Sequence, residues 1–322
     1  MCIICNFPQN SPQERSISLT KIDCYSCCLV TSIPSSLVNL RILDCEGCVL
    51  LTTIPSTLVN LQKLVCRNCP RLSAIPSTFV NLHTLHCSNC SLLTTIPSTL
   101  IHLETLRCNN CSFLTNIPDT LINLDSLDCS KCFLLASVPS TLVNLRTLDC
   151  HDCPLFVTVP DTLVQIQHLL CYECPNFISI PSTLIKLQTM YTRGCSILNI
   201  IPSTLVKLER LYCSECPMLT TIPPDLVNLH VLDCRKCPIL TTIHSTLVKL
   251  LGLHCSDCSY LYIPFKIQQK FKLRANNKVS VFVSRLKWRW RQLKIKKMTR
   301  FLNNQNESIP CVLNNLISNY LY

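Results

Sequence analysis

Apolar positions along this chain recur with a period of 21 residues. Each unit follows the pattern LxxLxCxxCxxLxxIPxxLxx, and twelve units keep this register. They begin at Leu19, Leu40, Leu61, Leu82, Leu103, Leu124, Leu145, Ile166, Leu187, Leu208, Leu229 and Leu250. Prolines mark the same step from Pro34 to Pro223; His244 replaces the next one, and Pro264 comes one residue early. A fixed period of this length is typical of a stacked array of supersecondary units.

The two halves of a unit predict different backbone conformations. Alternation in Leu-x-x-Leu-x-Cys predicts a short strand with one buried side. Proline lacks a backbone N–H, so the Ile-Pro-Ser-Thr half cannot continue a sheet and should form an extended or 3₁₀ return on the convex side. One unit is too short to bury its own apolar stripe, so neighbours must stack. We therefore expect an α/β-class, right-handed horseshoe solenoid with a parallel β-sheet on its concave face.

The register divides the chain into three parts. Residues 19–264 hold the twelve repeats. In residues 1–18, Cys2 and Cys5 precede Pro12 with the usual spacing, but an extra residue then breaks the period. We interpret this segment as a degenerate N-terminal capping repeat. Residues 265–322 form a basic C-terminal cap or tail.

The repeated pattern resembles the leucine-rich-repeat family, whose units open with LxxLxLxx followed by Asn or Cys. The resemblance covers residues 1–264 and recurs twelve times. The IPxxLxxL half resembles the short repeats of bacterial effectors and plant receptors, and the Cys-x-x-Leu step resembles repeats of F-box proteins. The near-identical IPSTLVNL copies are also similar in style to giant-virus leucine-rich-repeat proteins.

Eleven of the twelve units carry a Cys-x-x-Cys pair, and the remaining unit has Thr192 with Cys195. Repeated pairs of this kind suggest a zinc–thiolate site. Cysteine is also a small, readily buried apolar residue, and threonine matches its size but cannot supply a thiolate. The substitution favours columns of buried thiols, with metal binding and disulfides as the alternatives.

The positions beside the first cysteine of each pair vary between units and should point away from the core. We expect a protein partner to bind this face. Tyr and Arg are common interface anchors, and a cluster rich in them falls on three successive strands. The expected partner-binding residues are His168, Leu170, Tyr172, Tyr191, Arg193, Arg210 and Tyr212.

Little in the sequence points to catalysis. The chain has only three glycines, which excludes a glycine-rich phosphate loop. Asp128, Asp149 and His151 should be neighbours, but on an open sheet face we interpret them as solvated charges. We expect no enzyme activity, no cofactor, no metal site and no small-molecule substrate.

Charge is concentrated at one end of the chain. Residues 265–322 carry 13 of the 29 Lys and Arg but only one acidic residue, Glu307. This segment could cap the solenoid end, or contact an anionic membrane or nucleic acid. The expected polyanion-binding residues are Lys287, Arg289, Arg291, Lys294, Lys296 and Lys297.

The predicted function is that of a non-enzymatic protein-interaction scaffold. A ubiquitin-ligase adaptor or substrate receptor, suggested by the effector and F-box resemblance, and a metal–thiolate protein are the alternatives. The N-terminal sequence has no basic start followed by a long apolar run, and no stretch approaches the length of a membrane span. We therefore expect an intracellular protein, cytoplasmic or nuclear, with free thiols.

Overall fold

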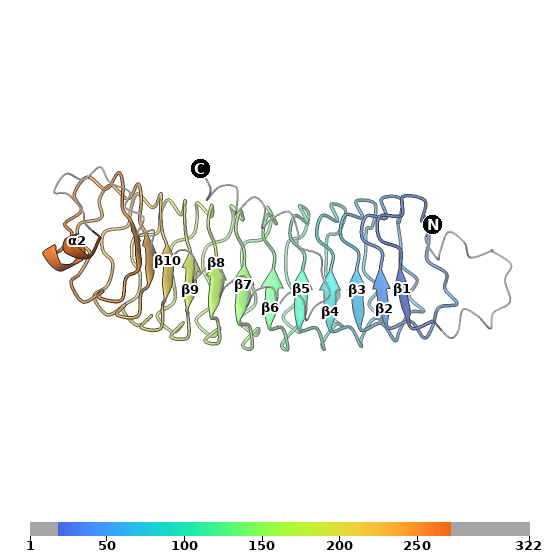
Figure 1. Ribbon diagram of the computed structural model, residues 1–322. Helices are drawn as coiled ribbons and strands as arrows, with labels where there is room; N and C mark the ends of the chain where they lie inside the picture. Colours follow the sequence, from blue (N-terminus) through green and yellow to red (C-terminus); the bar gives the residue numbers. More distant parts are fainter. Residues whose placement is uncertain (1–18, 272–322) are drawn as a thin grey trace. The chain divides into compact units, whose positions relative to one another are not determined.

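The computed structural model describes residues 19–271, which form one stack of repeats (Figure 1). Each repeat contributes a strand of three residues to a single parallel sheet, in which strand order follows chain order. The strands are β1 (Lys21–Asp23), β2 (Ile42–Asp44), β3 (Lys63–Val65), β4 (Thr84–His86), β5 (Thr105–Arg107), β6 (Ser126–Asp128), β7 (Thr147–Asp149), β8 (His168–Leu170), β9 (Thr189–Tyr191), β10 (Arg210–Tyr212), β11 (Val231–Asp233) and β12 (Gly252–His254). The expected parallel-strand solenoid is confirmed.

Neighbouring strands pair with an offset of one full sequence period. Ile22 lies opposite Leu43, and Leu211 lies opposite Leu232. Equivalent side chains therefore stack in columns, and the middle residue of every strand is buried. The buried leucine, isoleucine and cysteine columns form one continuous core, as the apolar pattern requires.

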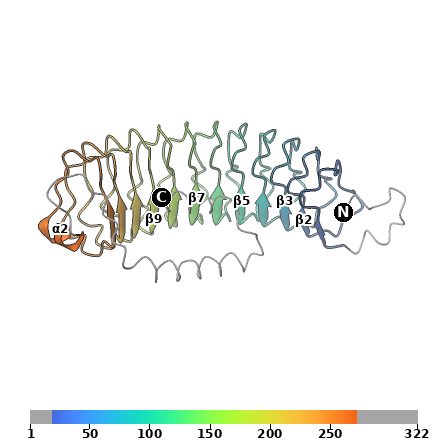
Figure 2. The same cartoon turned by 45° about the horizontal axis from the view of Figure 1, so that its top comes forward.

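The returns are built from tight turns. In the second repeat the carbonyl of Pro55 accepts a hydrogen bond from the N–H of Leu58, whose own carbonyl accepts from Leu61. His244 keeps the same turn where proline is missing, because its carbonyl accepts from Leu247. Figure 2 shows the strands along one side of the stack and the returns on the other.

Polar side chains of the returns join each repeat to the one before it. The hydroxyl of Thr57 donates to the carbonyl of Ser35 at 2.7 Å, and the amide of Asn60 donates to the carbonyl of Val38 at 2.9 Å. The same threonine bond recurs in most later repeats. The Ser-Thr and Asn of the IPSTLVNL copies are therefore structural.

The residue before the second cysteine of each pair has a positive φ, between 52° and 74°. Glycine, asparagine and aspartate tolerate this left-handed conformation best. Two of the three glycines, Gly47 and Gly194, occupy this position. The full column is Ser26, Gly47, Asn68, Asn89, Asn110, Lys131, Asp152, Glu173, Gly194, Glu215, Lys236 and Asp257.

Both cysteines of each pair point into the core. We call them the first and second cysteine columns; the first includes Thr192. The second-column thiol donates to the backbone carbonyl of the first-column residue in the preceding repeat, as from Cys69 to Cys45 at 3.1 Å. Sulfur–oxygen distances are 2.9–3.3 Å at all eleven steps from the Cys48–Cys24 step to the Cys258–Cys234 step. The predicted burial of both cysteine columns is confirmed.

The one helix of the described residues, α2 (Phe265–Phe271), follows the last repeat. The carbonyl of Pro264 accepts from the N–H groups of Ile267 and Gln268, so this proline starts a helix instead of a return. Ile267 and Phe271 are buried in the core. The first residues of the C-terminal segment thus pack on the core after the last repeat, while residues 1–18 and 272–322 lie outside the described part of the chain.

Thr192 offers a direct test of the first column. Its hydroxyl is buried and finds no hydrogen-bond partner among the described residues. Replacing Thr192 by Cys removes this unpaired hydroxyl, so we expect the free energy of unfolding in urea to rise by about 1–2 kcal/mol. The matched control, Cys171→Thr, buries a new hydroxyl in the neighbouring repeat and should lower stability; equal stability of all three proteins would contradict this account.

Candidate functional site

The cysteine columns are the first candidate for chemistry, and their geometry is structural. The second-column thiols donate to backbone carbonyls, and the thiols of both columns are buried in most repeats. Burial raises the pKa of the Cys129 thiol well above its usual range, which disfavours the thiolate that metal binding and redox exchange require. Among the described residues, no three His, Cys, Asp or Glu side chains are grouped as metal ligands. All described cysteines are free thiols.

The second candidate is the side of the sheet that faces away from the core, which we call the sheet face. The strands alternate as predicted: in β10 the side chain of Leu211 is buried, while those of Arg210 and Tyr212 are partly exposed. The residue that follows the first cysteine, such as Tyr172, lies on the same face. The variable positions of the sequence therefore form one surface.

Aspartates on the sheet face stabilise the turns that follow the strands. The Oδ1 atom of Asp128 accepts from the backbone N–H of Ser130 at 3.2 Å, and Asp149 accepts from His151 in the same way at 3.3 Å. Burial, and then the charge of Asp149, raises the pKa of Asp128. For Asp128 and Asp149 the interpretation as solvated charges is wrong, because both carboxylates are partly buried and accept from backbone N–H groups.

The predicted aromatic cluster is brought together on β8, β9 and β10. Leu170 lies opposite Tyr191, which lies opposite Tyr212 in the register of the sheet. The rings of Tyr191 and Tyr212 stack with centroids 4.3 Å apart and an interplanar angle of 5°. The ring of Tyr172 stacks in the same manner on His151, at 4.3 Å and 8°. Sequence reasoning placed these residues correctly but did not find His151 as part of the cluster.

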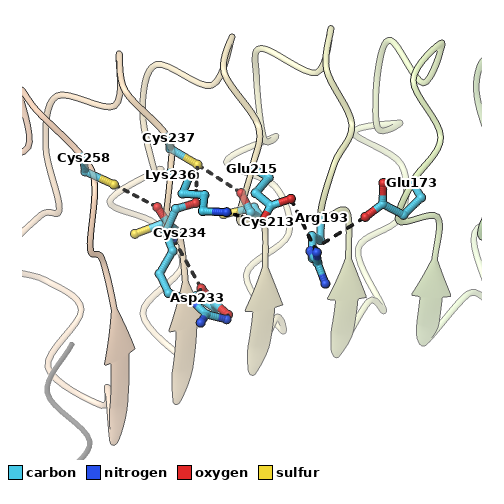
Figure 3. Close-up of polar contacts among 10 residues, drawn as sticks. Glu173, Arg193, Cys213, Glu215, Asp233, Cys234, Lys236, Cys237 and Cys258 are labelled. Atoms are coloured by element: carbon cyan, nitrogen blue, oxygen red, sulfur yellow. Dashed lines mark hydrogen bonds and ion pairs between the residues drawn. The ribbon is translucent and has the colours of Figure 1, made fainter. Parts of the chain in front are cut away.

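Arg193 is held in a row of ion pairs with Glu173 and Glu215 (Figure 3). Its guanidinium lies 3.8 Å from a carboxylate oxygen of Glu173 and 3.5 Å from one of Glu215, which also accepts from Lys236 at 3.0 Å. The bond from Lys236 is the main cause that lowers the pKa of Glu215. Arg193 was predicted as a binding residue; the structure shows that its charge is balanced within the chain.

His168 and Arg210 complete the predicted set at the start of these strands. Both are partly exposed, on β8 and β10 respectively. Burial, and then the charge of Arg210, lowers the pKa of His168, which favours its neutral form. This end of the cluster therefore presents one cation and one neutral imidazole.

Comparison with known proteins identifies the repeats. Four segments match the family model Leucine Rich Repeat: residues 39–61, 81–103, 102–124 and 207–229. The chain is built from leucine-rich repeats. Among curated proteins, none matches this sequence.

Several solved structures are similar to this chain. The functional domain of InlJ from Listeria monocytogenes, which includes a cysteine ladder, is 20% identical over 82% of this chain and 68% of that one, with a TM-score of 0.50. A leucine-rich-repeat protein of Leptospira interrogans is 15% identical over 84% and 97% of the two chains, with a TM-score of 0.42. The Arabidopsis receptor kinase HAESA, solved with a peptide hormone, is 18% identical over 81% and 49%, with a TM-score of 0.40. Of the three, only the InlJ domain reaches a TM-score of 0.50, and at 20% identity that likeness establishes the fold alone.

A basic region on β3 to β5 of the leucine-rich-repeat sheet was not found from the sequence. His86 is buried between the strands that carry Val65 and Arg107. The guanidinium of Arg67 lies 2.8 Å from its Nδ1 atom. Burial, and then the charges of Arg107 and Arg67, lowers the pKa of His86 to about 2. The sequence signal is that Arg67, His86 and Arg107 are all basic. Only the strand register shows that they are neighbours.

The predicted polyanion-binding residues lie outside the described residues. They are Lys287, Arg289, Arg291, Lys294, Lys296 and Lys297. Over residues 19–271 no helix has the length and hydrophobicity needed to cross a lipid bilayer.

Buried ladder thiols should resist alkylation in the folded protein. Among the cysteines of residues 19–271, we expect the exposed Cys28 to react first with iodoacetamide at neutral pH, and the partly exposed Cys27 and Cys255 to follow. First-column thiols such as Cys129 should react only after unfolding, because burial blocks access and raises the thiol pKa. Peptide mass spectrometry measures each site, and rapid native labelling of Cys129 would contradict the prediction.

His86 should make stability depend on pH. Its pKa is near 6.5 in the unfolded chain and about 2 in the folded chain, so below pH 6.5 only the unfolded state gains this proton. Stability is therefore lost as pH falls. From pH 7.5 to pH 5.0, the unfolding free energy of the wild type should fall by about 2 kcal/mol more than that of His86→Asn. His102→Asn, at an exposed histidine, is the control; an unchanged pH dependence in His86→Asn would refute the assignment.

Proposed function

We propose that this leucine-rich-repeat chain is a non-enzymatic scaffold that binds a protein partner on the sheet face, centred on β8 to β10. The observation that carries the proposal is the stacked pair Tyr191 and Tyr212, in register with Leu170. Core columns are constant along the chain, whereas the sheet-face columns vary. Variation confined to an exposed surface is what a binding scaffold requires.

The stacked tyrosines suit an interface anchor for a physical reason. Each ring is packed against its neighbour and both side chains are only partly exposed, so little side-chain entropy remains to be lost on binding. Tyrosine offers a large apolar surface together with a hydroxyl that can donate or accept. A partner would therefore meet a preformed apolar strip bordered by Arg210 and the row of ion pairs at Arg193.

The structure gives no specific support to the other two functions. A metal–thiolate protein needs exposed or clustered thiolates, whereas the ladder thiols are buried and bonded to carbonyls. A ubiquitin-ligase adaptor would be recognised by ligase subunits among the bound proteins, so the binding experiment below tests this function. We therefore carry the scaffold forward alone.

The test compares partner capture by the full chain and by Tyr191→Ala/Tyr212→Ala. Immobilised proteins are exposed to lysate of the native cell, and bound proteins are quantified by mass spectrometry. A partner of the cluster should be retained by the wild type and depleted with the double variant. With the purified partner, Kd should increase about 30-fold, as for interface residues that contribute about 2 kcal/mol.

Tyr25→Ala is the matched control, because Tyr25 lies on the same face in the first repeat, far along the sheet from β9. Urea unfolding of all variants shows whether the fold is kept. Equal Kd values for the wild type and the double variant, with both proteins folded, would reject the cluster as the binding site.

A further inference from the structure

Four of the most exposed large apolar side chains lie at the C-terminal end of the repeats. Tyr260 is 73% exposed, Tyr262 62%, Phe265 67% and Val248 63%. All four come after Leu247, the core leucine of the eleventh return. Val248 precedes β12, Tyr260 and Tyr262 follow it, and Phe265 begins α2. Three exposed aromatic rings in six residues have no counterpart elsewhere in the described repeats.

Two hydrogen bonds place Tyr262 and Val248 at the end of the stack. The N–H of Tyr262 donates to the carbonyl of Thr241 at 2.7 Å, which adds it to the end of the stack. Lys270 donates to the carbonyl of Val248 at 2.6 Å, so the end of α2 lies against the last return. Figure 1 shows α2 at the end of the described repeats. We call Val248, Tyr260, Tyr262 and Phe265 the end patch.

Lysines outnumber acidic residues near the end patch, where Asp257 is the acidic residue of the last described repeat. Lys249, Lys266 and Lys270 lie within the same return and helix, and Lys266 and Lys270 are exposed. After Asp257 the sequence has no acidic residue until Glu307, and residues 272–322 add eleven Lys and Arg and both tryptophans of the chain. The sheet face, in contrast, mixes acidic and basic groups in ion pairs.

We propose that the end patch docks this chain on an anionic lipid surface. Aromatic rings with a polar atom and long basic side chains are the residue types favoured at the boundary between headgroups and acyl chains. The apolar groups would enter that boundary, while the lysines remain with anionic headgroups. A lipid surface of this kind accounts for exposed apolar side chains beside an excess of lysine at the same end of the repeats.

Co-sedimentation of the full chain with vesicles tests the proposal. Vesicles of phosphatidylcholine with one quarter phosphatidylserine should bind the wild type far better than vesicles of phosphatidylcholine alone, and added salt should weaken binding. Tyr260→Ser/Tyr262→Ser/Phe265→Ser should lower the partition coefficient at least tenfold. Lys266→Gln alone should lower it about fivefold, the effect of about 1 kcal/mol for one surface charge.

The control Val59→Ser/Val80→Ser/Ile101→Ser removes three exposed apolar side chains from distant returns and should bind as the wild type does. Urea unfolding confirms that each variant is folded, and Lys266→Gln, at an exposed site, remains informative if the triple variant is not. Wild-type binding by the end-patch triple variant would show that the basic tail acts alone and would overturn the proposal. Absent preference for phosphatidylserine vesicles, or binding of a 30-nucleotide RNA in place of vesicles, would also overturn it.

Discussion

Every repeat depends on its neighbours to bury its apolar side chains. A unit of 21 residues with a three-residue strand has no interior of its own, so its leucines and cysteines are covered only when the next unit stacks in register. Strand hydrogen bonds, the thiol-to-carbonyl ladder and the threonine bonds of the returns all join one repeat to the next. The strict period follows from this constraint, because one residue more or less would break all three contacts.

The same constraint divides the residues of a repeat into two groups. Positions that point inward or close a turn accept only a narrow range of residue types, so these residues recur with little change. Positions on the sheet face have neighbours at a fixed spacing but no partner in the core, so they are free to vary. Tyr191 and Tyr212 stack because the register places equivalent positions of adjacent strands side by side. A rigid, varied surface is thus a direct consequence of a constant core.

The ends of the stack pose a different physical problem. The last repeat has no following unit, and α2 covers its core with Ile267 and Phe271. Although α2 covers the core at this end, Tyr262 and Phe265 remain exposed beside lysines. In our proposal, this end of the chain also supplies a lipid-binding surface that the repeats themselves lack.

The sequence alone determined the solenoid, the burial of both cysteine columns and the contiguity of the aromatic cluster, because each follows from a period of 21 residues. It did not reveal that Asp128 accepts backbone donors, that Glu173 and Glu215 balance Arg193, or that His86 is buried among cations. These features depend on which side chains of adjacent repeats come within hydrogen-bond distance. A one-dimensional pattern fixes the columns, but only the packed sheet sets the distances, burial and charge between them.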